Sequence, residues 1–256
     1  MKLITDKNMR IISSITADSE AAGFPATNLQ QYDPGLIWKC DLFDWAAAKM
    51  EAQMDGYAEI TITAYLGAAG QINFIWLNNA NFLNATIQAN SANTWDSPAV
   101  SKAAVMAEDD VGVIKGVFEF SASPLRYVRV VIPVQALTDG SSVPFLGNLI
   151  LGQAQEMIVS TWRPQVVEEF NDFLSDGGSY HEASKGKARH IFSVGILNEP
   201  KSVIDSLPIK GWEVAIIDTE FGSVADSYLV YRPKGKQPVV RSPIDCDIEF
   251  VLRELV

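Results

Sequence analysis

The feature that most constrains the fold is the stretch QINFIWLNNANFLNATIQANS at residues 71–91. Apolar residues occupy every second position on both sides of an asparagine-rich centre: Ile72, Phe74, Trp76, Leu83, Ala85, Ile87 and Ala89. This period of two is typical of strands with one buried face, because successive strand side chains point to opposite faces. The central Asn78, Asn79 and Asn81 favour a turn or left-handed backbone angles. The stretch therefore predicts two strands joined by a turn, and it carries no catalytic group.

Further alternating segments lie on either side of this stretch. The expected strands are around residues 11–15 and at residues 59–66, 113–120, 125–134 and 145–155. We expect Gly67 and Gly70 to end the 59–66 strand, and residues 91–110 to form a loop. Residues 45–48 suit either a short helical turn or a strand edge. About eight short strands with turn signals between them favour a β-sandwich over a parallel α/β sheet.

The remainder, residues 156–256, also reads as β-rich. Expected strands lie at residues 190–197, 213–218, 227–231 and 246–252. Residues 166–174 have apolar side chains at helical spacing, although a strand would also fit them. A second short helix is expected at residues 200–207, because proline is favoured at the first helical position. We therefore expect a smaller β-rich C-terminal domain with one or two short helices.

Composition limits the partners. The chain has 256 residues, of which 48% are hydrophobic, and a formal net charge of -11. That charge repels phosphate backbones, and no basic stripe offsets it, so we expect no nucleic-acid partner. No run of about 18 apolar residues exists, so membrane insertion is not expected. The first twenty residues lack a signal-peptide core, so we expect a protein that is made and kept in the cytoplasm, or one that is exported by a route without a cleaved signal.

The motifs of common catalytic and metal sites are missing. His181 and His190 do not form a zinc-binding His-Glu-x-x-His helix, and Gly186-Lys187 lacks the glycine-rich loop of a phosphate site. There is no Gly-x-Ser-x-Gly elbow. The acidic residues 108–110 and 168–169 are adjacent in sequence, which is typical of a solvated face. We therefore predict no catalytic residues, no metal and no cofactor, and thus a protein that is not an enzyme.

The two cysteines, Cys40 and Cys246, lie near opposite ends of the sequence. Two cysteines in a chain of this length do not make a disulfide scaffold. We expect two buried free thiols, and a bridge between them remains the alternative.

A set of short motifs resembles a known family. The motifs are GFPA at 23–26, NL at 28–29, YDPGLIW at 32–38, FIWLNNANF at 74–82, ATI at 85–87, RYVRV at 126–130 and GNLILG at 147–152. In order and spacing they resemble the discoidin-like, galactose-binding-like jelly rolls, and among these a set of phage tail proteins. The resemblance covers about residues 10–155. It implies a mainly β chain, with an N-terminal jelly-roll β-sandwich at 1–155 and the smaller β-rich domain at 156–256.

The same resemblance implies a function. A phage tail protein of this kind would be a structural component of the distal tail or tail tip. It would act by homo-oligomerisation and by docking to other tail proteins of the virion, and the C-terminal domain and residues 176–187 would serve as adaptors. It would be made in the host cytoplasm and located in the virion tail. The alternative is a carbohydrate-binding module that recognises a cell-surface glycan.

Four residues are candidates for ligand or interface loops. Trp95 and Asp96 could stack on a sugar ring and accept bonds from its hydroxyls, or Trp95 could instead pin its loop onto the sandwich. Tyr32 and Asp33 lie where discoidin-like folds form part of the ligand-facing rim, and an Asp-Pro-Gly turn is their alternative role. Trp38 and Trp76 are expected in the core.

Overall fold

The computed structural model describes residues 2–5, 10–30, 36–55, 58–108, 112–156, 161–167, 170–174, 180–184, 189–200, 214–218, 227–231 and 245–254. The chain divides into two compact units. We call residues 8–154, with the short segment 221–227, the sandwich unit. The C-terminal unit comprises residues 155–220 and 228–256 together with the first seven residues. The expected domain division at residues 155 and 156 stays a prediction.

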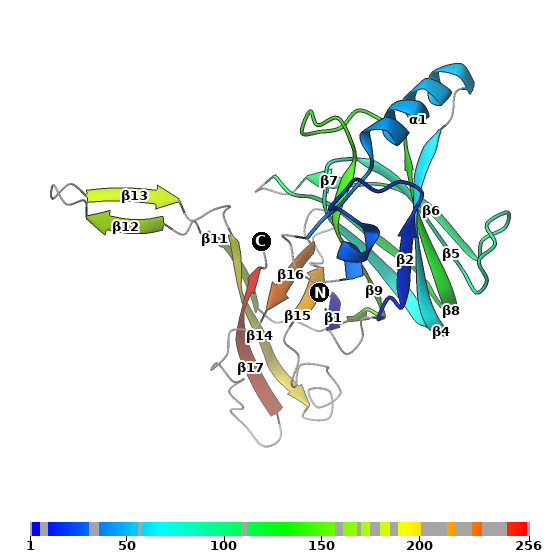
Figure 1. Ribbon diagram of the computed structural model, residues 1–256. Coiled ribbons are helices and arrows are strands. Elements are labelled where there is room, and N and C mark those ends of the chain that lie inside the picture. Colours follow the sequence, from blue (N-terminus) through cyan, green and yellow to red (C-terminus); the bar gives the residue numbers. More distant parts are fainter. Residues whose placement is uncertain are drawn as a thin grey trace. The chain divides into compact units, whose positions relative to one another are not determined.

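The sandwich unit is built mainly from antiparallel strands (Figure 1). Its elements are β2 Ser14–Ala17, the 3-10 helix η1 Ala26–Gln30, β3 Trp38–Lys39, α1 Leu42–Asp55, β4 Glu59–Ala80, β5 Asn84–Asn90, β6 Val100–Val105, β7 Ala107–Glu108, β8 Ile114–Pro133 and β9 Phe145–Gly152. The fold is the expected mainly β jelly roll.

Two long strands, β4 and β8, carry the fold from one layer to the other. The first half of β4 pairs with β2 and with the second half of β8, which also pairs with β5. The second half of β4 pairs with the first half of β8 and with β9. All of these pairings are antiparallel. β4 and β8 remain paired with each other in both halves, but each changes its second neighbour midway, from β2 to β9 for β4 and from β5 to β7 for β8. The sheet thereby wraps into two layers that enclose one core.

The change of partners coincides with an interruption of the ladder, which we had expected to be a strand end. The register between β4 and β8 shifts between Tyr65 and Gly70, and Gly67 has a φ of 73°. Glycine adopts this left-handed angle without the Cβ clash of other residues. The prediction that Gly67 and Gly70 end the strand is therefore wrong, because they bend a continuous strand. For the same reason the strands expected at 113–120 and 125–134 are one strand, β8.

The asparagine cluster contributes a second irregularity. Asn79 has a φ of 56°, the one positive value at a non-glycine residue in the described part of the chain. The β4–β8 register shifts there, between Asn78 and Ala80. The predicted left-handed angle is thus confirmed at Asn79, whereas the turn itself begins only after β4 ends at Ala80.

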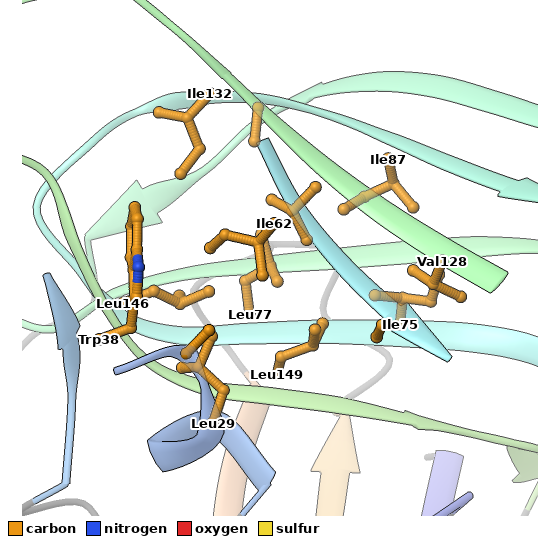
Figure 2. Close-up of a cluster of buried hydrophobic side chains, with 14 of the residues drawn as sticks. Leu29, Trp38, Ile62, Ile75, Leu77, Ile87, Val128, Ile132, Leu146 and Leu149 are labelled. Carbon is orange, nitrogen blue, oxygen red and sulfur yellow. The ribbon is translucent and has the colours of Figure 1, made fainter. Parts of the chain in front are cut away.

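The core lies between the two layers and takes every second side chain of the strands. Figure 2 shows the side chains that meet there, from η1, β3, β4, β5, β8 and β9. They include Leu29, Trp38, Ile62, Ile75, Leu77, Ile87, Val128, Ile132, Leu146 and Leu149. Trp38 is 0% exposed and belongs to this core, as predicted. Trp76 is also 0% exposed, but it alternates along β4 with the core residues Ile75 and Leu77 and therefore points to the opposite face of the strand.

Three local expectations needed correction. Residues 45–48 belong to the 14-residue helix α1, which is longer than a helical turn. The expected loop at 91–110 contains strands β6 and β7, which pair with β5 and β8 as edge strands. Around residues 11–15, the strand begins only at Ser14, and Ile11 is 82% exposed.

The C-terminal unit is β-rich as expected. Its elements are β1 Lys2–Thr5, β10 Gln155–Glu156, β11 Thr161–Val167, β12 Phe170–Leu174, β13 Tyr180–Ser184, β14 Arg189–Pro200, β15 Val214–Asp218, β16 Ser227–Tyr231 and β17 Asp245–Glu254. In the described part of this unit, seven strands form a sheet in the order β10-β1-β15-β16-β17-β14-β11, and β12 and β13 form a separate hairpin.

Of the two alternatives left open for residues 166–174, the described residues confirm the strand, and the helix is wrong. That segment forms the end of β11 and the strand β12. Its β-branched and aromatic residues fit a strand as well as a helix, and cross-strand pairing with β14 and β13 decides between them. Most of the helix expected at residues 200–207 lies outside the described residues.

Candidate binding surface

The layer that contains β5 and the second half of β8 presents a polar and aromatic outer face. Tyr127 and Arg129 of β8 alternate with Val128 and Val130, which are 0% exposed and belong to the core. Because the strand period is two, Tyr127 and Arg129 point away from the core. Neighbouring strands add Tyr65, opposite Tyr127, and Gln88, opposite Arg129.

Two tyrosines form the first part of this face. The ring centroids of Tyr65 and Tyr127 lie 4.9 Å apart, with their planes 30° from parallel. Both side chains are half-buried. A directly opposite pair on antiparallel strands brings the Cβ atoms close enough for such ring contact.

Arg129 forms the second part. Its Nε–H donates a hydrogen bond to Gln88 Oε1 at 2.9 Å, which fixes the direction of the guanidinium on the sheet. The guanidinium carbon lies 4.9 Å from the centroid of the Trp95 ring. That distance is within the range of a cation–π contact, in which the positive group is attracted to the aromatic face.

Trp95 reaches Arg129 from the loop between β5 and β6. The loop is held by its own hydrogen bonds: Asn90 Nδ2 donates to the Thr94 carbonyl at 2.8 Å, and Thr94 N–H donates to the Ala92 carbonyl at 2.9 Å. The indole Nε1–H of Trp95 donates to Asn93 Oδ1 at 2.9 Å. The ring is therefore oriented from two sides and remains half-buried.

We call Tyr65, Gln88, Trp95, Tyr127 and Arg129 the aromatic–arginine surface. Aromatic rings offer flat apolar faces to the C–H face of a sugar, while guanidinium and amide groups can bond its hydroxyls. This combination of flat apolar faces and hydrogen-bonding groups suits the binding of a ligand that has both an apolar face and hydroxyl groups.

The structure places the sequence candidates unequally. Trp95 lies on the surface just defined, and Asp96 is the next residue of the same loop, with an exposed side chain. Tyr32 and Asp33 lie outside the described residues. The selection of these four residues as ligand or interface residues stays a prediction.

Sequence reasoning missed Tyr65, Gln88, Tyr127 and Arg129 as members of a surface. Their outward direction was visible in the alternation of each strand. What the sequence did not show is that three strands and one loop bring them together, because that depends on the register between segments up to 64 residues apart.

The groups considered for metal chemistry are dispersed. Among the described residues, no group of three or more His, Cys, Asp or Glu side chains is placed to hold a metal ion. His181 and His190 belong to different strands, β13 and β14. In the same part of the chain, no helix is long and apolar enough to cross a membrane.

Cys40 is a buried free thiol. Burial raises its pKa above the ordinary value, and the negative charges of Asp44 and Asp41 add to that effect. The hydrogen bond between Cys40 Sγ and Ser19 Oγ, at 3.3 Å, acts in the opposite direction but does not cancel the rise. A thiol with a raised pKa is a poor nucleophile at neutral pH, so this cysteine has a packing role.

No family model matches the chain, and no curated protein matches it. Several solved structures are similar to part of it. Chitosan-binding module 1 of a chitosanase/glucanase from Paenibacillus sp. IK-5 shares 20% identity over 57% of this chain and 98% of that chain, with a TM-score of 0.39. The family 32 carbohydrate-binding module from C. perfringens NanJ, in complex with galactose, shares 14% identity over 60% of this chain and 100% of that chain, with a TM-score of 0.42.

A Streptococcus pneumoniae fucose-binding module shares 11% identity over 58% of this chain and 98% of that chain, with a TM-score of 0.41. At these levels of similarity, the ligands named for the three modules describe what those proteins bind and do not identify a ligand of this chain.

Proposed function

We propose that the sandwich unit is a non-catalytic carbohydrate-binding module that binds a sugar on the aromatic–arginine surface. The observation that carries the proposal is the contact between Trp95 and Arg129, with the guanidinium 4.9 Å from the ring centroid on the outer face of the sheet. Trp95 thereby pins its loop to the sheet and at the same time presents a preoriented aromatic ring beside polar donors.

Two side chains of the surface are held in place by hydrogen bonds before any ligand binds. Arg129 is fixed by Gln88, and Trp95 is fixed by Asn93, so two of the contact groups lose little conformational freedom when a ligand binds. Preorganisation of this kind lowers the entropic cost of association. The Tyr65–Tyr127 pair extends the aromatic area along the same face.

The charge of the chain narrows the ligand class. A net charge of -11 creates a long-range field that repels polyanions. Arg129 is already engaged with Trp95 and Gln88. We therefore propose a neutral saccharide, whose hydroxyls accept hydrogen bonds from the guanidinium and whose C–H face packs on the indole.

The proposal is tested by screening the full chain on a glycan array and measuring the affinity of the best neutral glycan by calorimetry. Trp95→Ala should weaken binding at least about tenfold, which corresponds to about 1.4 kcal/mol. Arg129→Ala should have a similar effect, because it removes both the donor and the support of the indole.

Phe43→Ala is the matched control. Phe43 is an aromatic residue that is 82% exposed on helix α1, away from the aromatic–arginine surface, so its removal should leave the affinity unchanged. Circular dichroism must show that all variants keep the wild-type fold. A chain that binds no glycan, or binds one equally well after Trp95→Ala and Arg129→Ala, contradicts the proposal.

A structural tail component is our second candidate function. It is supported by the exposed apolar side chains of α1, because large exposed apolar patches are typical of protein–protein contacts. In this function the chain would form homo-oligomers in the virion tail and dock to other tail proteins. Electron microscopy of the purified chain should then show rings, and uniform monomers at micromolar concentration would contradict it.

A further inference from the structure

Helix α1 has two apolar faces, and one of them faces solvent. Successive residues of a helix are rotated by about 100°, so Phe43, Ala47, Met50 and Met54 fall within one narrow stripe. Phe43 and Met54 are each 82% exposed and Met50 is 65% exposed. We call these four residues the α1 stripe.

The opposite face of the helix attaches it to the sandwich unit. Trp45 is 1% exposed and Ala48 is 7% exposed, and both belong to the core. Ala52 packs against the same core from the last turn. Packing among the described residues therefore explains one face only, and the α1 stripe has no role in the fold of that part of the chain.

We propose that the α1 stripe is an interface that binds the α1 stripe of a second copy of this chain, with the two helices parallel. The spacing of the stripe is four, three and four residues, the alternation with which helices pack as coiled coils. The glycan proposal and this one are independent, since α1 contributes no residue to the aromatic–arginine surface.

The exposed apolar area of the α1 stripe is of the size expected for a weak, reversible dimer. Its three large side chains and Leu42, which is 53% exposed, offer an apolar area on the order of 500 Å² per copy. Stable interfaces bury about 800 Å² on each partner, whereas weaker and transient ones bury less. The pair should therefore form at micromolar concentrations.

Charge selects the parallel direction. Asp44 and Glu51 are exposed and lie two turns apart on the same flank of the stripe. An antiparallel pair would place Asp44 of each copy beside Glu51 of the other, and like charges in such flanking positions repel. A parallel pair instead places Glu51 beside the uncharged Ala46 of the second copy.

Sedimentation velocity of the full chain, from about 1 to 200 µM, tests the interface. The weight-average mass should rise toward that of a dimer. Met50→Glu buries a charge in the centre of the stripe and should weaken association at least tenfold. Lys49→Gln changes the net charge by the same amount outside the stripe and should leave association unchanged.

Cysteine cross-linking tests the direction of the pair, in a chain whose native Cys40 and Cys246 are replaced by serine so that the introduced cysteine is its one thiol. In a parallel pair, residue 54 of one copy faces residue 54 of the other. Met54→Cys should therefore form an intermolecular disulfide when copper phenanthroline is added as the oxidant. Mass spectrometry of the linked peptide identifies the bond. In an antiparallel pair residue 54 faces Phe43 and no such link forms. The proposal is overturned by a chain that stays monomeric at 200 µM, by a dimer that Met50→Glu does not weaken, or by the absence of the Met54→Cys link.

Discussion

Single side chains hold distant segments of the sandwich unit together, and Asn81 is the clearest example. Its side chain is 1% exposed. The two hydrogens of the amide Nδ2 are shared among three acceptors, Asp139 Oδ1 at 3.1 Å, Ser141 Oγ at 2.6 Å and the Val143 carbonyl at 3.0 Å. Its Oδ1 accepts from Phe145 N–H at 2.8 Å. One asparagine therefore fixes the loop before β9 to the end of β4.

Asn81→Ala should lower the free energy of unfolding by about 1–3 kcal/mol, because it removes the hydrogen bonds of a buried side chain and leaves the Val143 carbonyl and the Phe145 N–H, which are half-buried, without that partner. Urea denaturation checks this. Asn84→Ala is the matched control: Asn84 Nδ2 donates to Gln135 Oε1 at the surface, and its loss should cost less than about 0.5 kcal/mol. Equal effects of the two substitutions would contradict the account.

The loop before β9 should also make the free energy of unfolding depend on pH, through the carboxyl group of Asp139. Partial burial acts to raise the pKa of Asp139, but hydrogen bonds from Ser141 N–H, Ser141 Oγ and Asn81 outweigh it and hold that pKa below its ordinary value of 3.8. Because the pKa of Asp139 is lower in the folded state than in the unfolded state, its ionisation stabilises the folded state at pH values above the unfolded pKa. This stabilisation is lost as the pH falls through the folded-state pKa.

Asp139→Asn should therefore reduce the free energy of unfolding at neutral pH, and the difference from the wild type should shrink as the pH falls below the ordinary pKa of 3.8. Urea titrations at a series of pH values measure the difference. A difference that persists unchanged in acid would show that the charge of Asp139 plays no part.

These residue roles show where sequence reasoning stops. The asparagine cluster correctly indicated an unusual backbone, and Asn79 does adopt a left-handed angle. The partners of Asn81 lie 58 to 64 residues further along the chain, so no local pattern could identify them. Most core residues were predictable, because a period of two depends only on neighbours along a strand. In β4 the register shift between Ile72 and Phe74 interrupts that period, so Ile75 and Leu77 enter the core in place of the expected Phe74 and Trp76.

At the scale of elements, the close approach of β9 to β4 depends on a glycine. A Cβ atom on Gly147 would lie 2.8 Å from Asn79 Cβ and 3.3 Å from the Asn78 carbonyl oxygen. The two strands pair directly here, with Asn78 opposite Asn148. Any side chain at position 147 therefore forces the strands apart.

Gly147→Ala should destabilise the fold by about 1–3 kcal/mol through this clash. Asn79→Gly removes the Cβ on the opposing strand, and glycine tolerates the φ of 56° at that position. The double variant should therefore be less destabilised than the sum of the single variants, which a double-mutant cycle in urea measures. Strict additivity of the two changes would count against the contact.

Element lengths were the part of the fold that sequence predicted least well. The sequence predicts a strand end at Gly67 and Gly70, yet β4 runs through both glycines and has a total length of 22 residues. Glycine marks both turns and bends, and pairing with β8 on both sides of the bend decides between the two. The helical spacing at residues 166–174 misled in the same way, because the segment pairs with neighbouring strands.

At the scale of the whole molecule, the chain order and the spatial units differ at the N-terminus. Strand β1 pairs with β10 and β15, so the first strand in sequence belongs to the C-terminal unit. Pairing across more than 150 residues cannot be read from a periodic pattern, so the partners of this first strand could not be predicted from the sequence.

Deletion of residues 1–5 should therefore expose the backbone groups of β15 and leave the sandwich unit intact. Hydrogen exchange followed by mass spectrometry should show faster exchange in residues 214–218 and unchanged exchange in β4 and β8. Faster exchange in β4 and β8 alone would contradict this assignment.

The central claim, that a saccharide binds beside Trp95, is tested most directly by nuclear magnetic resonance of the tryptophan indole N–H groups. During titration with the glycan selected on the array, the Nε1–H signal of Trp95 should shift in a saturable way, because this ring lies half-buried on the surface. The signals of Trp38, Trp45 and Trp76, which are at most 1% exposed, should stay in place. A bound glycan that leaves the Trp95 signal unmoved would contradict the account.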